Sequence, residues 1–438
     1  MKRALGVVAV LLLLLSACGS GGPDGGKARH PGVRSDFDGD GYGDLVVGDT
    51  TATVHGKYAA GYAAVLRGSA HGPRTGKPQV VTQDDLGFGK AGEGGAFGSP
   101  GTTVTADLDG DGRADLVTQA GRKTLFVVWG SDKGLSGAAA ARLTGSAPLA
   151  GDVNGDGHTD LVVGPGEGAR GENSFRLLLG PFSREGTPRR TTSLDLTPSD
   201  PQYPVGVPAA LGDVTGDGKD DLLVSWSILA DYAPVARATV LYRGSADGNL
   251  VKGPPLPDGF YGSSLRTVDV NHDGHDDVVA GLPCEMLGDE MVPEGGSRLS
   301  VLYGGTLKTS RVTEKTAGLP VGGPFMPCTF GAAPAVGDTD GDGYADVVFS
   351  VRPRTGPEEL IVLRGSAGGL TTEGAGAVPG GSAELLYNHG DRRAELVVAD
   401  RGQVRVWRGG SLLLAFTPSA LDLGPGIKSG YGGAWPVG

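Results

Sequence analysis

The sequence has 438 residues, of which 80 are glycine, and its formal net charge at pH 7 is −12. Such acidity argues against nucleic acid as a partner, because phosphates demand a basic face. The glycine content far exceeds the usual value near 7%, which predicts many tight turns.

The start of the chain has the features of an export signal. Lys2 and Arg3 are followed by an apolar run, Ala4 to Leu15, of about twelve residues, whereas a bilayer span needs roughly twenty. The next residues, Leu-Ser-Ala-Cys, resemble the lipobox of bacterial lipoproteins. That resemblance implies cleavage before Cys18 and a lipid on its sulfur. The alternative is an ordinary signal peptide with an incidental cysteine.

These features divide the chain into three parts. Residues 1–17 are the expected lipoprotein signal peptide, residues 18–32 have the composition of a flexible tether, and residues 33–438 form the folded part. We expect the mature protein to be exported and lipid-anchored on the outer side of the bacterial cell membrane. The Cys18 lipid would be its contact with that membrane.

An aspartate-rich loop of nine residues recurs six times in the folded part. It has Asp at position 1, Asp, Asn or Thr at position 3, Asp-Gly at positions 5 and 6, and Asp at position 9. The copies span residues 36–44, 107–115, 152–160, 213–221, 269–277 and 338–346. A seventh segment, Tyr387–Glu395, keeps Asp391 and Glu395 but has Tyr387 and His389 at positions 1 and 3. We expect its metal site to be lost.

Strand patterns follow each loop without any helical period. A second strand then ends in a recurrent turn, as in Arg67-Gly68-Ser69. Aromatic-glycine steps precede several loops, at Phe97-Gly98, Tyr261-Gly262 and Phe330-Gly331. The predicted unit is strand, acidic loop, strand, turn, strand, turn, strand.

The loops and the aromatic-glycine steps resemble the FG-GAP, or integrin α N-terminal, repeat family, also seen in bacterial proteins with VCBS-type repeats. The resemblance covers essentially all of residues 31–438. It implies an all-β, seven-bladed β-propeller of four-stranded antiparallel blades, with calcium in the loop between the first and second strands of a blade. Residues 429–438 look like a first strand with no loop after it, so we expect them to close the ring by completing the N-terminal blade.

The loops offer calcium the oxygen ligands that it prefers. Positions 1, 3 and 5 supply side-chain oxygens, position 7 its backbone carbonyl, and position 9 a carboxylate that can bind through both oxygens. The alternative is a merely polar turn. However, each of the six loops places three or four aspartates within nine residues, and these carboxylates would repel one another without a cation. We therefore expect up to six Ca²⁺ ions. The predicted ligands are Asp36, Asp38, Asp40, Tyr42, Asp44, Asp107, Asp109, Asp111, Arg113, Asp115, Asp152, Asn154, Asp156, His158, Asp160, Asp213, Thr215, Asp217, Lys219, Asp221, Asp269, Asn271, Asp273, His275, Asp277, Asp338, Asp340, Asp342, Tyr344 and Asp346.

Besides Cys18, the chain contains Cys284 and Cys328. In an oxidising compartment this pair predicts a disulfide. Two separately buried thiols are the alternative.

No catalytic constellation is visible in the sequence. Most of the seven histidines lie in the loops or the tether, and neither His55 nor His71 has a recognisable partner. We therefore expect a protein that is not an enzyme.

Recognition is expected on the face opposite the acidic loops, where the long connections gather. Its candidate residues are His55, Lys57, Tyr58, Tyr62, Trp226, Asp231, Tyr232, Glu285 to Glu294, Arg352 and Arg354. The sequence thus predicts a non-enzymatic, calcium-stabilised, envelope-anchored binding or adhesion module for an extracellular protein or glycan. The alternative is a polysaccharide-active hydrolase or lyase on a propeller scaffold.

Overall fold

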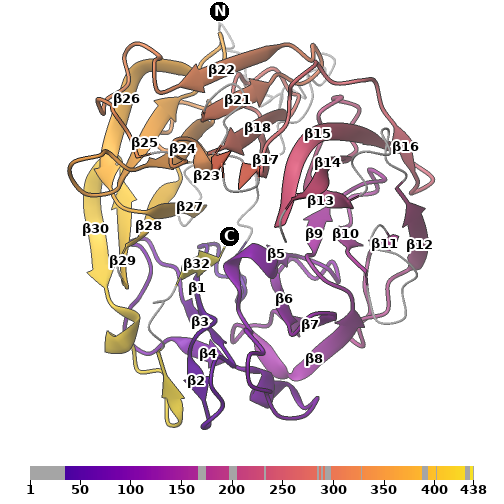
Figure 1. Ribbon diagram of the computed structural model, residues 1–438. Helices are drawn as coiled ribbons and strands as arrows, with labels where there is room; N and C mark the ends of the chain where they lie inside the picture. The colour runs from indigo at the N-terminus through magenta and orange to yellow at the C-terminus, as the bar shows by residue number, and fades with distance from the viewer. Residues whose placement is uncertain are drawn as a thin grey trace, which may run out of the picture.

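The computed structural model describes residues 35–165, 174–196, 205–230, 233–283, 286–287, 290–291, 297–326, 328–386, 393–400, 402–429 and 435–437. Seven four-stranded antiparallel sheets form a ring of blades (Figure 1). The predicted all-β, seven-bladed propeller is therefore confirmed.

Within each blade, hydrogen-bonded neighbours follow one another from the inner edge of the sheet to its outer edge. Blade 1 consists of β32 (Trp435–Val437), β1 (Leu45–Asp49), β3 (Tyr62–Leu66) and β4 (Gln79–Val81). Blade 2 consists of β5 (Thr103–Ala106), β6 (Asp115–Ala120), β7 (Thr124–Trp129) and β8 (Ser136–Thr144). Blade 3 consists of β9 (Leu149–Gly151), β10 (Asp160–Val163), β11 (Ser174–Leu179) and β12 (Arg190–Asp195). Blade 4 consists of β13 (Val205–Gly212), β14 (Asp221–Ala230), β15 (Ala233–Gly244) and β16 (Leu250–Lys252).

The remaining blades follow the same order. Blade 5 consists of β17 (Ser264–Val268), β18 (Asp277–Leu282), β21 (Arg298–Leu302) and β22 (Thr309–Thr313). Blade 6 consists of β23 (Ala332–Gly337), β24 (Asp346–Val351), β25 (Glu359–Arg364) and β26 (Thr371–Pro379). Blade 7 consists of β27 (Ser382–Leu386), β28 (Glu395–Asp400), β29 (Gln403–Arg408) and β30 (Ser411–Phe416).

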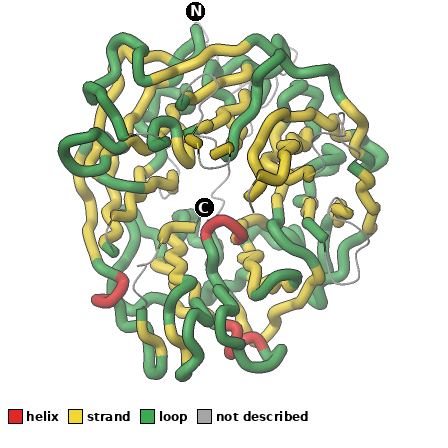
Figure 2. The backbone as a smooth tube through the Cα atoms, in the orientation of Figure 1, coloured by secondary structure: helices red, strands yellow, loops and turns green. Residues whose placement is uncertain are grey.

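Two small sheets and three short helices complete the elements. The pair β19 (Met286–Leu287) and β20 (Glu290–Met291) forms one sheet, and β2 (Thr53–Val54) and β31 (Ile427–Lys428) form the other. Helix in the described residues is limited to the 3-10 turns η1 (Gln83–Leu86), η2 (Pro100–Thr102) and η3 (Pro418–Ala420) (Figure 2). None of the described helices is long and apolar enough to cross a membrane.

The two ends of the folded part meet in blade 1. Strand β32 pairs antiparallel with β1, with Val46 opposite Val437 and Gly48 opposite Trp435. A second contact is the pairing of β2 with β31. The C-terminal strand therefore completes the N-terminal blade, as predicted, and the ring has no open junction between blades 7 and 1.

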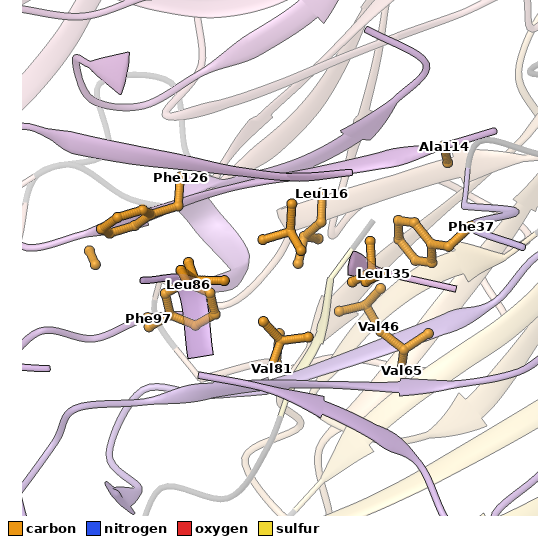
Figure 3. Close-up of a cluster of buried hydrophobic side chains, with 13 residues drawn as sticks. Phe37, Val46, Val65, Val81, Leu86, Phe97, Ala114, Leu116, Phe126 and Leu135 are labelled. Carbon is orange, nitrogen blue, oxygen red and sulfur yellow. The ribbon is translucent and has the colours of Figure 1, made fainter. Parts of the chain in front are cut away.

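Hydrophobic clusters fill the junctions between blades. The second strand of each blade is almost wholly buried, as in β1 and β24, because each sheet packs against a neighbour on both faces. Between blades 1 and 2, Phe37, Val46 and Val65 from one side meet Leu116 and Phe126 from the other (Figure 3). Equivalent clusters occur at the other six junctions. The core is thus a ring of inter-blade contacts.

Successive antiparallel strands place alternate connections on opposite sides of the ring. We call the side with the six acidic loops the loop face. The connections between second and third strands, and those from one blade to the next, lie on the other side, which we call the connection face. Its longer segments include residues 50–61 and 82–102.

Two aromatic residues predicted on the connection face belong to the core instead. Tyr62 is fully buried in β3, and Trp226 is buried in β14. Both lie in clusters between blades. Their assignment to the recognition face was wrong, because an aromatic residue within a strand faces the neighbouring blade.

Candidate metal sites

Each acidic loop is folded around the carboxylate at its first position. In the first loop, Asp36 Oδ1 accepts hydrogen bonds from the amides of Gly39 and Asp40, at 2.7 and 3.2 Å. Its Oδ2 accepts one from Gly41, at 2.8 Å. The same contact from the sixth-position glycine occurs in all six loops, at 2.8 to 2.9 Å. Gly41 has φ 89°, a conformation that a side chain would strain.

Three loops bring carboxylates together closely enough for one ion. In each, one carboxylate oxygen per residue lies within 4.8 Å of the others. The groups are Asp36, Asp38 and Asp40; Asp107, Asp109 and Asp115; and Asp338, Asp340 and Asp346. Calcium binds oxygen at 2.3–2.6 Å, so ligands on opposite sides of it are up to about 5 Å apart. The donor atoms and their spacing therefore fit Ca²⁺.

The other three loops have an uncharged residue at position 3. Asn154 Oδ1 accepts the Asp156 amide at 3.0 Å, and Asn271 Oδ1 accepts the Asp273 amide at 3.2 Å. Asp38 Oδ1 makes the equivalent contact in the first loop. The asparagines therefore keep an oxygen in the same place but remove one charge. Thr215 carries the shortest side chain at this position and offers only a hydroxyl.

The ninth-position aspartates also accept backbone hydrogen bonds that the sequence did not reveal. Asp115 Oδ1 accepts the amide of Gly130, in the turn after β7, at 2.8 Å, and its Oδ2 accepts the Leu108 amide at 2.9 Å. Paired contacts of this kind recur in all six loops, with Thr215 as the loop donor in blade 4 and the second position as donor elsewhere. This carboxylate therefore ties each acidic loop to the outer turn of its own blade.

Burial disfavours the ionised form of these carboxylates, because it removes the charge from water. It raises the pKa of Asp44, Asp115 and Asp277 to about 7, and that of Asp160 and Asp221 to about 6. The amide hydrogen bonds lower the pKa and offset this only in part. A divalent cation among the carboxylates would favour the ionised form. The chemistry of the donor set is thus that of a cation site.

Arginines contact several loops from neighbouring segments. Arg184 of blade 3 reaches Asp109 and Asp111 of blade 2, at 2.5 and 2.7 Å. Arg364 contacts Asp340 and Asp346, at 3.3 and 2.7 Å. These ion pairs balance part of the local negative charge.

The loops of successive blades are also joined by backbone hydrogen bonds. At four junctions, the amide at position 8 of one segment donates to the carbonyl at position 1 of the preceding loop, as from Ala114 to Asp36 at 2.9 Å. The turn of the later blade adds a second bond, as from Ser131 to the Phe37 carbonyl at 3.1 Å. Backbone hydrogen bonds therefore join several neighbouring loops on the loop face.

On the connection face, His55 has a partner that the sequence did not reveal. His55 Nδ1 lies 2.8 Å from Asp84 Oδ2, and the Asp84 side chain is only 6% exposed, whereas that of His55 is 49% exposed. Burial raises the pKa of Asp84, but hydrogen bonds from the Ala91 amide and His55, with the charge of Lys90, lower it overall. The expectation that His55 stands alone was wrong.

The segments around His55 form a compact platform, which we define as residues 53–60, 82–97 and 424–428. His55 and Gly56 are the central residues of a two-residue hairpin turn, with φ 48° and 83°. The His55 amide donates to the Gly426 carbonyl at 2.8 Å, and the Gly94 amide donates to the Tyr58 carbonyl at 3.0 Å. Tyr58 itself is 64% exposed.

Other predicted residues lie where the structure does not test them. The seventh segment is described only from Arg393 onward, although Glu395 is fully buried at the start of β28. Cys18, Asp231 and Tyr232 lie outside the described residues. So does Cys284, and the disulfide with Cys328 therefore stays a prediction. Most of the segment from Glu285 to Glu294 is likewise not described.

Known proteins match the chain in part. Residues 107–163, 152–224 and 213–280 match the model of the FG-GAP-like repeat. Among curated proteins, none matches the sequence.

Several solved structures are distantly similar to the chain. BBS1N in complex with ARL6DN is 14% identical, with a TM-score of 0.44 over 73% of this chain and 82% of that chain. A mutant of AofleA from Arthrobotrys oligospora is 10% identical, with a TM-score of 0.36 over 74% and 85%. The exotype rhamnogalacturonan lyase YesX is 15% identical, with a TM-score of 0.35 over 82% and 63%. Likenesses this distant do not bear on the function of this chain. The matched repeats and the observed blades together make this a seven-bladed β-propeller with FG-GAP-like repeats.

Proposed function

We propose that the protein is a calcium-stabilised, non-enzymatic binding module held at the cell envelope. The observation that carries this proposal is the structural difference between the two faces. The loop face repeats one acidic geometry six times, which suits a scaffold. The connection face carries irregular segments on a rigid ring, which suits recognition.

Calcium would be held by the thirty predicted ligands, five to each loop. The residues at position 7, Tyr42, Arg113, His158, Lys219, His275 and Tyr344, would contribute backbone carbonyls. Their amides donate to the fifth-position carboxylates in all six loops, at 2.9 to 3.1 Å. Each bond holds the peptide group between positions 6 and 7, which adjoins the peptide group that contains the position-7 carbonyl. When bound, calcium supplies positive charge and structural order.

Among the described segments of the connection face, the platform offers groups that suit a ligand. Val54, Ala60 and Ala91 form a small buried cluster within it, with Ile427 packed against them. Tyr58 offers an exposed aromatic ring, and Lys57 and Lys90 offer exposed charges. Rigid aromatic and polar groups of this kind favour recognition of an extracellular protein or a glycan.

The test is binding of the soluble protein that starts after Cys18 to a glycan array and to envelope extracts, with and without calcium. We expect saturable binding that the double variant His55→Ala and Tyr58→Ala abolishes. The variant Lys133→Ala alters an exposed residue on the loop face and serves as the matched control. Equal binding by both variants would place recognition elsewhere.

Attachment to the envelope rests on the lipobox resemblance at Cys18. The variant Cys18→Ala should lose the lipid, detected as a mass difference on the N-terminal peptide, and should be released from membranes.

A disulfide between Cys284 and Cys328 should leave no free thiol after denaturation of the mature soluble form.

One observation favours the alternative, an enzyme acting on polysaccharide. Because ionised Asp84 accepts a hydrogen bond from His55 Nδ1, neutral His55 carries its lone pair on Nε2. An exposed imidazole oriented by a sheltered carboxylate is able to accept a proton from a substrate. Turnover of a polysaccharide by the wild type, lost in His55→Gln and reduced in Asp84→Asn, would support this function. Binding without turnover supports the first.

A further inference from the structure

Two aspartates at position 8 of their own loops hold the loop of the preceding blade. The Asp220 amide donates to the Asp152 carbonyl at 2.8 Å, and Asp220 Oδ2 accepts the Asp152 amide at 2.6 Å. Asp276 makes the same two contacts with Asp213, both at 2.9 Å. Each pair therefore fixes the backbone of a first-position calcium ligand from both sides.

The glycines before these ligands leave room for the carboxylates. A Cβ atom on Gly151 would lie 2.5 Å from Asp220 Oδ2, and one on Gly212 would lie 2.7 Å from Asp276 Oδ2. Gly151 ends the regular strand β9, so its backbone does not itself demand glycine. At the junction between blades 1 and 2, the corresponding residues are Ser35 and Ala114.

The two supported loops both lack a carboxylate at position 3. The first contains Asn154 and the second Thr215 at that position. An anchored first ligand would compensate in part for the missing charge, because it lowers the ordering cost of ion binding. Two of the three loops with an uncharged third position thus receive a position-8 carboxylate, whereas the loop that contains Asn271 is followed by Ala345 at position 8.

We propose that Asp220 and Asp276 are positioning residues that couple the calcium sites of blades 3, 4 and 5 in series. This inference rests on the calcium binding proposed above. Asp220 precedes Asp221, which closes the blade 4 loop through the amides of Thr215 and Gly244, at 2.9 and 3.1 Å. An ion that orders this loop fixes Asp221, then Asp220, and so the first ligand of blade 3. The pair Asp276 and Asp277 links blade 5 to blade 4 in the same way. Coupling of this kind acts in both directions.

Hydrogen exchange resolved by peptide, at graded calcium concentrations, tests the coupling. In Asp220→Ala we expect the calcium midpoint of segment 149–160 to rise about tenfold, the scale of one lost charged hydrogen bond. The loops of blades 1, 2 and 6 should keep their midpoints. Asp217→Ala, which removes a ligand from the blade 4 loop alone, should also raise the midpoint of segment 149–160. The control is Asp247→Ala, on an exposed turn of the same blade and face.

A glycine variant separates positioning from a general loss of stability. Gly151→Ala should displace the Asp220 carboxylate and raise the same midpoint, yet add little when Asp220 is already alanine. Additive effects would overturn the proposal. So would unchanged exchange of segment 149–160 in metal-free Asp220→Ala, because the contact with the Asp152 amide does not depend on calcium. A third outcome separates this inference from the proposed function. If Asp220→Ala changes the exchange of segment 149–160 without metal, but no wild-type loop responds to calcium, Asp220 still positions the blade 3 loop. The coupling of calcium sites is then wrong, and so is the calcium binding of the proposed function.

Discussion

At the scale of single residues, the carboxylates of one acidic loop differ in what they do for the fold. Asp111, at position 5, is partly exposed and contacts Arg184 and its own loop. Asp115, at position 9, is fully buried and accepts two backbone amides. The fifth position therefore adds only partly exposed contacts to the fold, whereas the ninth position holds two buried backbone amides.

Asparagine substitutions at these two positions should separate the roles. Asp115→Asn presents an amide group to the Leu108 or Gly130 N–H, so we expect a loss of about 2 kcal/mol in the free energy of unfolding, even in EDTA. Asp111→Asn should cost less than about 0.5 kcal/mol in EDTA, because its exposed ion pair contributes little. In calcium, both variants should lose the stabilisation from one site, about 1.4 kcal/mol when calcium is tenfold above its Kd. Urea unfolding measures both quantities, and equal losses in EDTA would contradict the assignment.

At the scale of elements, the turn after each third strand packs against the loop of the preceding blade. A Cβ atom on Gly130 would lie 2.4 Å from the Ala114 carbonyl and 3.0 Å from the Phe37 carbonyl. Both obstacles are backbone atoms, one in the same blade and one in the blade before. Gly244 and Gly365 face equivalent carbonyl pairs. Glycine recurs in this turn because two blades meet there without space for a side chain.

Gly130→Ala should therefore weaken the junction between blades 1 and 2. We expect a loss of about 1–3 kcal/mol in the free energy of unfolding, the usual cost of overpacking a well-packed site. Gly76→Ala is the matched control, because a Cβ there has no heavy atom within 4 Å. Thermal and urea melts would decide between them. A Gly130→Ala protein as stable as the control would show that the turn can shift freely.

Strand β32 gives a second prediction at this scale. Deletion of residues 429–438 removes the innermost strand of blade 1 but leaves the pairing of Thr53 with Lys428. The exposed edge of β1 should lower the melting temperature by about 5 °C or more, at about 2–4 °C per kcal/mol. An unchanged melt would mean that β2 and β31 alone close the ring.

At the scale of the whole molecule, the sequence predicted the features that are local in the chain. Nine consecutive residues contain a complete loop, so the six loops could be recognised from the sequence. The resemblance to FG-GAP repeats implied the seven blades, and the aromatic-glycine pattern of residues 429–438 predicted the closing strand. The partners of Asp115 and His55 lie 15 and 29 residues away, and no short pattern records such contacts. The burial of Trp226 likewise depends on the neighbouring blade. What joins blade to blade became visible only in the folded ring.

Because these contacts join each loop to a turn and to the next blade, loss of calcium should spread along the loop face and stop there. At about 1.4 kcal/mol per site, six sites would contribute roughly 8 kcal/mol, comparable to the stability of a whole domain. EDTA should therefore lower the melting temperature markedly. It should also speed hydrogen exchange in the six loops and at the turn amides that position 9 holds, such as Gly68 and Gly130.

The platform on the connection face is the internal control for this experiment. The amides of Gly94 and Ala96 bond to the carbonyls of Tyr58 and Ala59, all within the platform. Their exchange should therefore change less than that of the loops when calcium is removed. Equal deprotection of the loops and the platform would mean that calcium holds the entire fold and not the loop face. Unchanged exchange in all six loops would contradict the prediction that calcium stabilises this protein.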